Sequence, residues 1–396
     1  MLPTPFYPKQ LPLCESMDWK RWAGYYVPRS YQLQHENEYY AIRTAAGLID
    51  ISPLFKLRIA GPDSLALLNR VFVRDLSRLK EGRLAYVAWC DAEGYVLGDG
   101  TVLRQGPETY FFTCEDPTAA WLERHAIGMN VTITDETRAL AGLALQGPSS
   151  ARILIQAGAI SIRELKYFDA TPTSVNGIDF WISRSGYTGD LGYEMWPPAD
   201  RAPELWDTLM EVGSKFALRA VGLKALNVCR IEAGLLQKEV DYHNASRVLT
   251  REQKSIPYEL GFGWMINLDR EPFVGQSALQ KLHKPAWNLV GLEINWDQTR
   301  GLYESKGLPP LLPTEAWTSS TPLYRDRARQ HQVGYATSGT WSPVLKKYIA
   351  LATIEKSYPS KTVQIELAVE HSRHSVDARI VSPRFYDPPR KRALVG

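Results

Sequence analysis

The alternation of apolar and polar residues in the first third of the chain predicts strands that alternate with short helices. Apolar positions at helical spacing indicate a helix from Glu36 to Gly47, and a second helix is expected to begin near Ser64. Period-two alternation predicts four strands, Lys56–Ala60, Arg83–Trp89, Tyr95–Arg104 and Thr109–Thr113. Antiparallel strands interleaved with helices are typical of an α+β domain.

The junction before the helix at Ser64 has a counterpart further along the chain. Gly61-Pro62 lies between a predicted strand and this helix, and Gly147-Pro148 lies between a strand at Leu140–Leu145 and an apolar helix that follows Ser150. The repetition indicates an internal duplication of a strand–helix unit, although Gly-Pro is also a common way to begin a helix.

A glycine-rich stretch from Ser183 to Trp196 predicts a strand, a tight loop and a second strand. The apolar run Ile178–Ile182 feeds into the loop, and Pro197-Pro198 ends the outgoing strand. Glycines are placed every three residues, at Gly186, Gly189 and Gly192. They allow either an ordinary turn or close approach of a flat ligand to the backbone. The loop is not a dinucleotide-binding fingerprint, because its glycines do not open a helix.

The rest of the chain is helical at first and then rich in strands. The expected helices are Glu204–Val212, Val221–Ala233, ended by Gly234, and Ser277–Leu282, and a strand is predicted to start at Glu259–Trp264. Residues 284–318 contain several prolines and glycines and are expected to form a boundary with a long excursion. Short strands follow at Leu289–Ile294, Gln332–Thr337, Tyr348–Ile354, Val363–Val369 and Val376–Val381. Their spacing favours a small β-barrel or sandwich.

Composition and charge limit the classes of protein to which this chain could belong. The chain of 396 residues is 44% apolar and 22% charged, with a net charge of +3, so it is expected to form two or three globular domains. No block of like charge indicates a nucleic-acid partner. The four cysteines form no C-x-x-C pair, and the chain has neither a signal-peptide pattern nor a long apolar run. These features predict a cytoplasmic protein with reduced thiols, no metal site and no membrane span.

Several ordered motifs resemble the folate-dependent aminomethyltransferases, the family of the glycine cleavage T-protein and its relatives. The motifs are Arg43-Thr-Ala-Ala-Gly-Leu-Ile-Asp-Ile-Ser52, Asp91-Ala-Glu-Gly-Tyr-Val-Leu-Gly-Asp99, Leu145-Gln-Gly-Pro148, Gly186-Tyr-Thr-Gly-Asp-Leu-Gly-Tyr-Glu194, Arg230-Ile-Glu-Ala-Gly-Leu235 and Ser342-Pro-Val-Leu-Lys-Lys347. Each motif alone is weak, but all six occur in the family's order. The resemblance extends from about Pro3 to Phe385.

The resemblance implies a three-domain ring with tetrahydrofolate in its central cavity. Two related α+β domains would occupy residues 1–140, with an N-terminal wrap, and residues 141–285, with the folate-binding hairpin. The C-terminal β-barrel would occupy residues 286–396.

The resemblance also assigns the cofactor-binding residues. Glu194 matches the family's pterin-binding glutamate, and a carboxylate suits the two N–H donors on the pterin's amino-pyrimidine edge. Tyr187, Tyr86 and Tyr167 match aromatic positions of the folate pocket, although a purely structural role remains open for each.

The family's catalytic aspartate matches Asp99. Its expected role is electrostatic stabilisation and proton relay near the bridging nitrogens of the folate. The family's aspartate pair is reduced here to Gly98-Asp99, which is similar to the family's aromatic O-demethylases.

Two further departures concern the tail of the folate and the donor. Leu226 replaces an arginine that binds the glutamate tail in T-proteins, so the tail would be held by Lys224, Arg230 or Lys238, or held only loosely. Arg230 could instead be a helix-end cation with no ligand. Residues 237–243 replace the family's Tyr-Gly-Asn-Asp. Tyr242 and His243 in this segment are candidates for contacting the substrate or donating a proton.

These features predict a tetrahydrofolate-dependent demethylase that moves a methyl group from a small O-, N- or S-methyl donor to tetrahydrofolate. Two alternatives stay open. One is an aminomethyltransferase of glycine-cleavage type that works with a lipoyl carrier protein, a partner not favoured by the departures. The other is a folate-binding regulatory protein without transfer activity.

Overall fold

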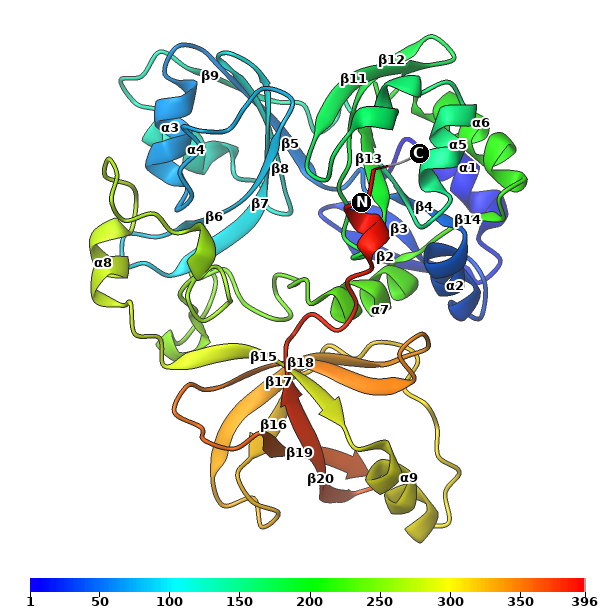
Figure 1. The fold of residues 1–396 in the computed structure, drawn as a ribbon, viewed down its shortest axis with the longest axis vertical. Coiled ribbons are helices and arrows are strands. Elements are labelled where there is room, and N and C mark those ends of the chain that lie inside the picture. The colour runs from blue at the N-terminus through cyan, green and yellow to red at the C-terminus, as the bar shows by residue number, and fades with distance from the viewer. Residues whose placement is uncertain (395–396) are drawn as a thin grey trace.

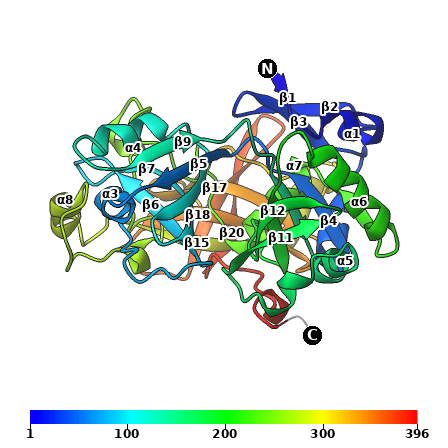
Figure 2. The same cartoon turned by 90° about the horizontal axis from the view of Figure 1, so that it is seen from above.

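The computed structural model describes residues 1–394, and the chain forms three lobes (Figure 1). Two lobes contain an open sheet with helices, and the third is a closed barrel of six strands. The barrel lies below both open-sheet lobes in Figure 1 and between them in Figure 2. The predicted α+β architecture with a C-terminal β-barrel is therefore confirmed.

The six-stranded lobe is built on a sheet with the strand order β11-β12-β13-β10-β4-β14. Its strands are β4 (Ala46–Asp50), β10 (Leu143–Gln146), β11 (Ala170–Val175), β12 (Ile178–Ser183), β13 (Gly192–Trp196) and β14 (Leu218–Ala220). Its helices are α1 (Tyr7–Gln10), α2 (Glu36–Thr44), α5 (Ser150–Gln156), α6 (Ala202–Ser214) and α7 (Leu223–Ala233). A small sheet of β1 (Leu2–Pro3), β3 (Tyr25–Ser30) and β2 (Asp18–Trp22) packs on α7 through β3.

The five-stranded lobe has the strand order β6-β7-β8-β5-β9. Its strands are β5 (Phe55–Ala60), β6 (Leu84–Cys90), β7 (Val96–Gly106), β8 (Thr109–Cys114) and β9 (Thr132–Asp135). Its helices are α3 (Ser64–Val71), α4 (Ala119–His125) and α8 (Gln276–Lys281). The apolar stripe of α3, Leu67, Leu68 and Val71, is fully buried against the sheet, which explains why this helix forms here.

The barrel closes in the order β15-β18-β17-β16-β19-β20. Its strands are β15 (Trp287–Ile294), β16 (Thr321–Tyr324), β17 (Gln332–Ser342), β18 (Lys347–Glu355), β19 (Thr362–Val369) and β20 (Ser372–Val381). Alternate residues such as Val363 and Ile365 fill its interior. The helix α9 (Trp296–Ser305) lies inside the predicted excursion and begins where the Asn295 side chain accepts a hydrogen bond from the Gln298 backbone.

The two Gly-Pro junctions adopt the same geometry in the two open-sheet lobes. Gly61 has φ +130° and Gly147 has φ +125°. In each case the glycine carbonyl accepts a hydrogen bond of 3.0 Å from the amide three residues later, at Ser64 and Ser150. A Cβ on either glycine would meet a backbone oxygen at 2.6 Å, so both positions require glycine. The Gly-Pro junction that is repeated in the sequence thus has the same backbone geometry in both lobes.

The sheets divide the chain differently from the predicted boundary at residue 140. Strand β4 pairs with β10 and with β14, so residues 46–50 lie in the middle of the six-stranded sheet. The five-stranded lobe is an insertion between β4 and β10, and it is completed by residues 251–282. Long-range pairing of this kind leaves no mark in the local pattern.

The strand predicted at Glu259–Trp264 is wrong. This segment consists of turns and a short 3₁₀ helix, η4 (Gly263–Met265). Leu260 and Phe262 are buried, and the Phe262 ring packs edge-on against Tyr86 and Tyr242. The apolar residues therefore cover the tyrosines instead of joining a sheet.

A buried charge network joins the lobes to the C-terminal segment. The Arg43 guanidinium on α2 pairs with Glu232 on α7, with an Nε–Oε2 distance of 2.9 Å. The Ser342 hydroxyl of the barrel strand β17 donates to Glu232 at 2.5 Å. Arg390, in the segment that climbs from the barrel to the six-stranded lobe (Figure 1), pairs with Asp190 at 2.7 Å. These pairs fix α7 and the hairpin loop relative to the barrel.

Candidate functional site

Asp99 lies near the start of β7 and is held by two tyrosine hydroxyls. Tyr86 on the neighbouring strand β6 donates to Oδ2 at 2.7 Å, and Tyr242 donates to Oδ1. Ala88 pairs with Asp99, so Tyr86, two residues away on β6, projects from the same face of the sheet. The structure thus brings together three of the predicted site residues.

The charge state of Asp99 is set by removal from water more than by any partner. Loss of solvent raises the pKa of Asp99, the hydrogen bonds from Tyr242 and Tyr86 and the Lys238 ammonium oppose this shift, and the net direction is upward. Burial also raises the pKa of both tyrosines well above the usual value, so they remain neutral donors. A partly exposed carboxylate with a raised pKa is suited to accepting and returning a proton.

The predicted hairpin forms from β12 and β13, which pair directly. Glu194, on β13, accepts a hydrogen bond of 2.5 Å from the Ser185 hydroxyl through Oε2. Burial raises the pKa of Glu194, which the Ser185 bond partly offsets. Among residues 1–394, its other oxygen has no hydrogen-bond partner, so acceptor capacity is left for a ligand.

The loop glycines have a packing role. A Cβ on Gly186 or Gly192 would meet the side chain of Gln146 at 2.0–2.4 Å. That amide lies in the loop, donating to the Ser185 carbonyl at 3.1 Å and accepting from the Thr188 hydroxyl at 2.8 Å. The two glycines therefore let Gln146 brace the hairpin that carries Glu194.

Tyr187 and Tyr167 extend the site from the hairpin lobe. The Tyr187 hydroxyl donates to the Leu236 carbonyl at 2.5 Å, and both burial and Asp99 raise its pKa. Burial raises the pKa of Tyr167 to about 12, and the Glu194 carboxylate contributes to the shift. The Asp99 carboxylate thus acts electrostatically on Tyr187, and the Glu194 carboxylate acts on Tyr167.

Arg230 and Lys238 are engaged within the protein. Arg230 has a side chain that is 1% exposed, forms an ion pair with Asp241 and donates from Nε to Asn227 at 2.7 Å. Its Nη2 group is buried and has no partner among the described residues. Lys238 is paired with Asp116 at 2.5 Å. The hydrogen-bond donors of Arg230 and Lys238, which were candidates for holding the folate tail, are thus mostly engaged within the protein.

Among residues 1–394, His243 has its side-chain contact with Glu239 and no hydrogen bond or ion pair to Asp99 or its tyrosines. Its side chain is 39% exposed and its Nδ1 lies 3.0 Å from the Glu239 carboxylate. The adjacent Tyr242 is only 2% exposed. Consecutive residues of an irregular segment thus face different surroundings, a difference that local sequence does not encode.

Glu115 is a neighbour of Asp99 that the sequence did not indicate. It directly follows Cys114, the last residue of β8, which pairs with Gly100, so the chain leaves the sheet at Glu115. Burial raises the pKa of Glu115 to about 7. The available signal was the strand register, which sequence alone does not give.

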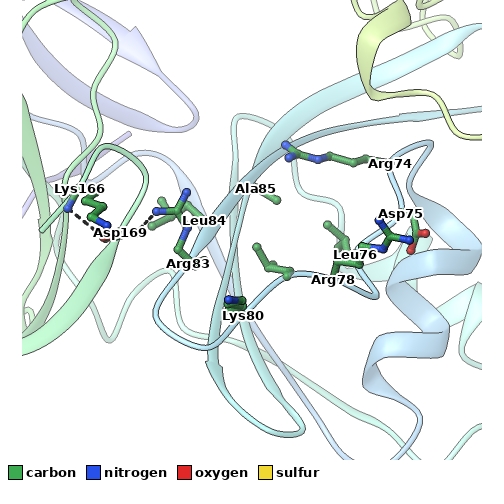
Figure 3. A pocket seen from close by; sticks show the side chains of 11 residues that line it. Arg74, Asp75, Leu76, Arg78, Lys80, Arg83, Leu84, Ala85, Lys166 and Asp169 are labelled. Atoms are coloured by element: carbon green, nitrogen blue, oxygen red, sulfur yellow. Dashed lines mark hydrogen bonds and ion pairs between the residues drawn. The ribbon is translucent and has the colours of Figure 1, made fainter. Parts of the chain in front are cut away.

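A separate cavity of about 550 Å³ lies between the two open-sheet lobes (Figure 3). The charged residues of its lining are mainly basic and include Arg74, Arg78, Lys80, Arg83 and Lys166. It contains none of the predicted site residues, although Arg74 donates to the Tyr86 carbonyl at 3.0 Å. Asp169 in this cavity is bonded to Arg83 and to the Lys166 amide, so it has few free acceptors for chemistry.

Among residues 1–394, no group of three or more His, Cys, Asp or Glu side chains is arranged to hold a metal ion. None of the helices in that range combines the length and apolarity needed to cross a bilayer.

Comparison with known proteins gives concordant matches. A family model described as the GCVT N-terminal domain matches residues 13–270, and one described as the glycine cleavage T-protein C-terminal barrel domain matches residues 311–387. Aminomethyltransferases of Bacillus cereus (strain AH820) and Bacillus thuringiensis subsp. konkukian (strain 97-27) are each 32% identical over 372 residues, which covers 92% of this chain and 93% of the relative. The fold is also that of the glycine cleavage system aminomethyltransferase T from Bartonella henselae, with a TM-score of 0.81, 23% identity and 98% coverage of both chains.

Proposed function

This chain belongs to the glycine cleavage T-protein family, and we propose that it transfers a one-carbon unit from a small donor to tetrahydrofolate. The observation that carries the proposal is the arrangement around Asp99, a partly exposed carboxylate bonded to two neutral tyrosines and close to the hairpin residue Tyr187. A partly exposed carboxylate flanked by aromatic rings suits a flat substrate that must lose a proton.

The residues of the hairpin fit the pterin part of tetrahydrofolate. The free oxygen of Glu194 offers an acceptor to the paired N–H donors of the pterin edge, and Ser185 orients the carboxylate by holding the other oxygen. Tyr187, Tyr86 and Tyr167 supply ring faces for stacking. Tetrahydrofolate would bring the nucleophilic nitrogen, whereas the protein contributes orientation, exclusion of water and a proton acceptor at Asp99.

The relatives favour an aminomethyl group as the unit that is transferred. The 32% identical proteins are aminomethyltransferases, and the match extends over nearly the whole of both chains. On this basis the donor would be an aminomethyl-loaded lipoyl carrier protein, and Asp99 would accept the proton lost as the carbon joins the folate.

Two observations favour a second candidate, demethylation of an O-, N- or S-methyl compound. A Cβ at Gly98 would meet the Trp89 ring at 2.6 Å, so the first aspartate of the family's pair has no room here. Leu226 lies in an apolar cluster with Ile42 and Val228, so no cation replaces the family's arginine at this position. Gly98 thus changes the part of the site next to Asp99, and Leu226 changes the part expected to hold the glutamate tail.

An assay of products separates the candidates. Purified protein is incubated with tetrahydrofolate and either aminomethyl-loaded lipoyl carrier protein or a panel of methylated compounds. Methylene-tetrahydrofolate and ammonia, formed only with the carrier, support the aminomethyltransferase. The appearance of 5-methyltetrahydrofolate supports the demethylase. Tight binding of tetrahydrofolate without turnover of any donor would overturn both and favour a non-catalytic regulatory protein.

A further inference from the structure

The cations that were predicted to hold the folate tail are occupied by carboxylates of the protein. Tetrahydrofolate ends in a glutamate, whose carboxylates need charged or neutral hydrogen-bond donors in the protein. Each predicted cation is already paired, and the pairs are Arg230 with Asp241, Lys238 with Asp116, and Lys224 with both Asp18 and Glu315. Leu226, at the position of the family's arginine, lies in an apolar cluster. Cations without such partners are therefore the stronger candidates for the tail.

The basic cavity between the two open-sheet lobes contains cations of this kind (Figure 3). Among residues 1–394, the side chains of Arg78, Lys80 and Lys166 have neither a hydrogen bond nor an ion pair. All three residues are exposed, so a ligand can reach them from solvent. The volume of about 550 Å³ lies within the range of small-molecule sites.

The two carboxylates in the lining leave the cavity with a net positive charge. Asp169 pairs with Arg83 and accepts a hydrogen bond of 2.9 Å from the Lys166 backbone amide. Asp75 accepts a hydrogen bond of 2.9 Å from the Ser77 backbone amide. The basic side chains outnumber these two carboxylates, and a recess lined by one sign of charge concentrates ligands of the opposite sign. The cavity is thus suited to an anion.

The cavity adjoins the residues that were predicted to contact the folate. Leu84 of the lining lies two residues before Tyr86 on β6, so the two side chains project from the same face of the sheet. Leu84 also belongs to the apolar cluster against which Tyr187 packs. On the opposite wall, Lys166 directly precedes Tyr167. One strand, one cluster and one loop thus connect the cavity with the candidate site.

We propose that this cavity binds the carboxylates of the folate's glutamate tail through Arg78, Lys80 and Lys166. This inference rests on the proposed function, and it places the tail between the two open-sheet lobes and not beside Leu226 on α7. Exposed ion pairs are individually weak, so the three cations act together, and their long side chains follow a flexible anion. The pterin remains at the hairpin that carries Glu194.

The decisive experiment compares the binding of tetrahydrofolate with that of tetrahydropteroate, which has the same rings but lacks the glutamate. Wild type should bind tetrahydrofolate more tightly, and added salt should reduce the preference. A variant that combines Arg78→Gln, Lys80→Gln and Lys166→Gln should bind tetrahydrofolate about tenfold more weakly. Its dissociation constant for tetrahydropteroate, measured by calorimetry, should be unchanged because this ligand has no tail to lose.

A matched variant controls for the loss of net charge. It combines Arg124→Gln, Arg152→Gln and Lys215→Gln, which remove three exposed cations outside the cavity. This variant should bind both ligands as wild type does. The melting temperatures of the two triple variants should stay close to that of wild type, since all six positions are exposed.

Different failures of the experiment have different meanings. Equal wild-type affinity for the two ligands, a loss below twofold in the cavity variant, or an equal loss for both ligands would overturn the tail site alone. Unchanged folate binding with weaker binding of a lipoyl carrier protein would also overturn it and would assign the cavity to the carrier. Failure of the wild-type protein to bind either ligand would overturn the proposed function, and the inference with it.

Discussion

Asp99 and Asp241 are two aspartates enclosed by the same group of lobes, but their oxygens are satisfied in different ways. Asp241 is buried and receives an ion pair from Arg230, hydrogen bonds from the Thr337 and Ser338 hydroxyls of the barrel at 2.5 and 2.7 Å, and the Gln237 amide at 2.8 Å. Among the residues that the structure describes, Asp99 receives only two tyrosine hydroxyls, and it keeps some exposure.

The difference shows that two carboxylates removed from water can still differ in the donors that surround them. The donors around Asp241 include a buried cation and two hydroxyls of the barrel, so this carboxylate ties residues 237–241 to the barrel. Asp99 has neutral donors that leave its pKa raised, which costs stability but keeps the carboxyl ready for proton transfer. The choice of partners, a guanidinium or a phenol, separates the two roles.

The largest effect on activity is expected from Asp99→Asn. The amide preserves size and polarity but cannot accept a proton, so turnover should fall about 10²- to 10⁴-fold. Folding should be nearly unaffected, because the substitution removes a poorly solvated charge. The initial rate of one-carbon transfer and the melting temperature measure the two outcomes. Turnover within tenfold of wild type would show that Asp99 is not the proton acceptor.

At Asp241 the main effect of a substitution is expected on stability, and not on activity as at Asp99. Asp241→Asn leaves the Arg230 guanidinium buried without its counter-charge, which should reduce the free energy of unfolding by about 3–5 kcal/mol. Urea unfolding followed by tryptophan fluorescence measures the loss. The double variant Asp241→Asn with Arg230→Met removes both charges and should recover part of the stability. A double variant no more stable than Asp241→Asn would mean that the ion pair is not the source of the effect.

Much of the fold and part of the candidate site could be predicted from the sequence. Local pattern and motif predicted the hairpin around Glu194, the strand that carries Asp99 and the barrel, because each depends on residues close in the chain. Other features depend on contacts between distant segments. They are the pairing of β4 with β10, the partner of Arg230 and the position of Glu115. The strand predicted at Glu259–Trp264 was wrong because apolar residues that cover tyrosines resemble, in sequence, those that a strand buries.

A smaller effect is expected when one phenol beside Asp99 is removed. Tyr242→Phe deletes a hydrogen bond that stabilises the charged carboxylate, so the pKa of Asp99 should rise further. Because transfer needs the ionised form, activity should be lost at a higher pH on the acid side of the profile. A lost donor of this kind is worth about 1–3 kcal/mol, so the acid limb of the profile should move upward by roughly one to two pH units.

Tyr86→Phe provides the matched test, since Tyr86 donates to the other oxygen of Asp99. Both variants should move the acid limb of the kcat profile in the same direction. A shift toward lower pH in either variant would contradict the assignment of the tyrosines as donors to a charged Asp99.

The smallest effect is expected at His243, the residue next to Tyr242. Its imidazole is partly exposed and its nearest charged partner is Glu239, four residues earlier, so it neither touches Asp99 nor supports the buried Asp241. An exposed pair of this kind contributes little to stability. His243→Ala should therefore keep turnover within twofold and leave the pH profile unchanged, whereas Tyr242→Phe alters both. A tenfold loss in His243→Ala, measured with the same donor, would mean that residues 237–243 rearrange when substrate binds and bring the imidazole to the reacting atoms.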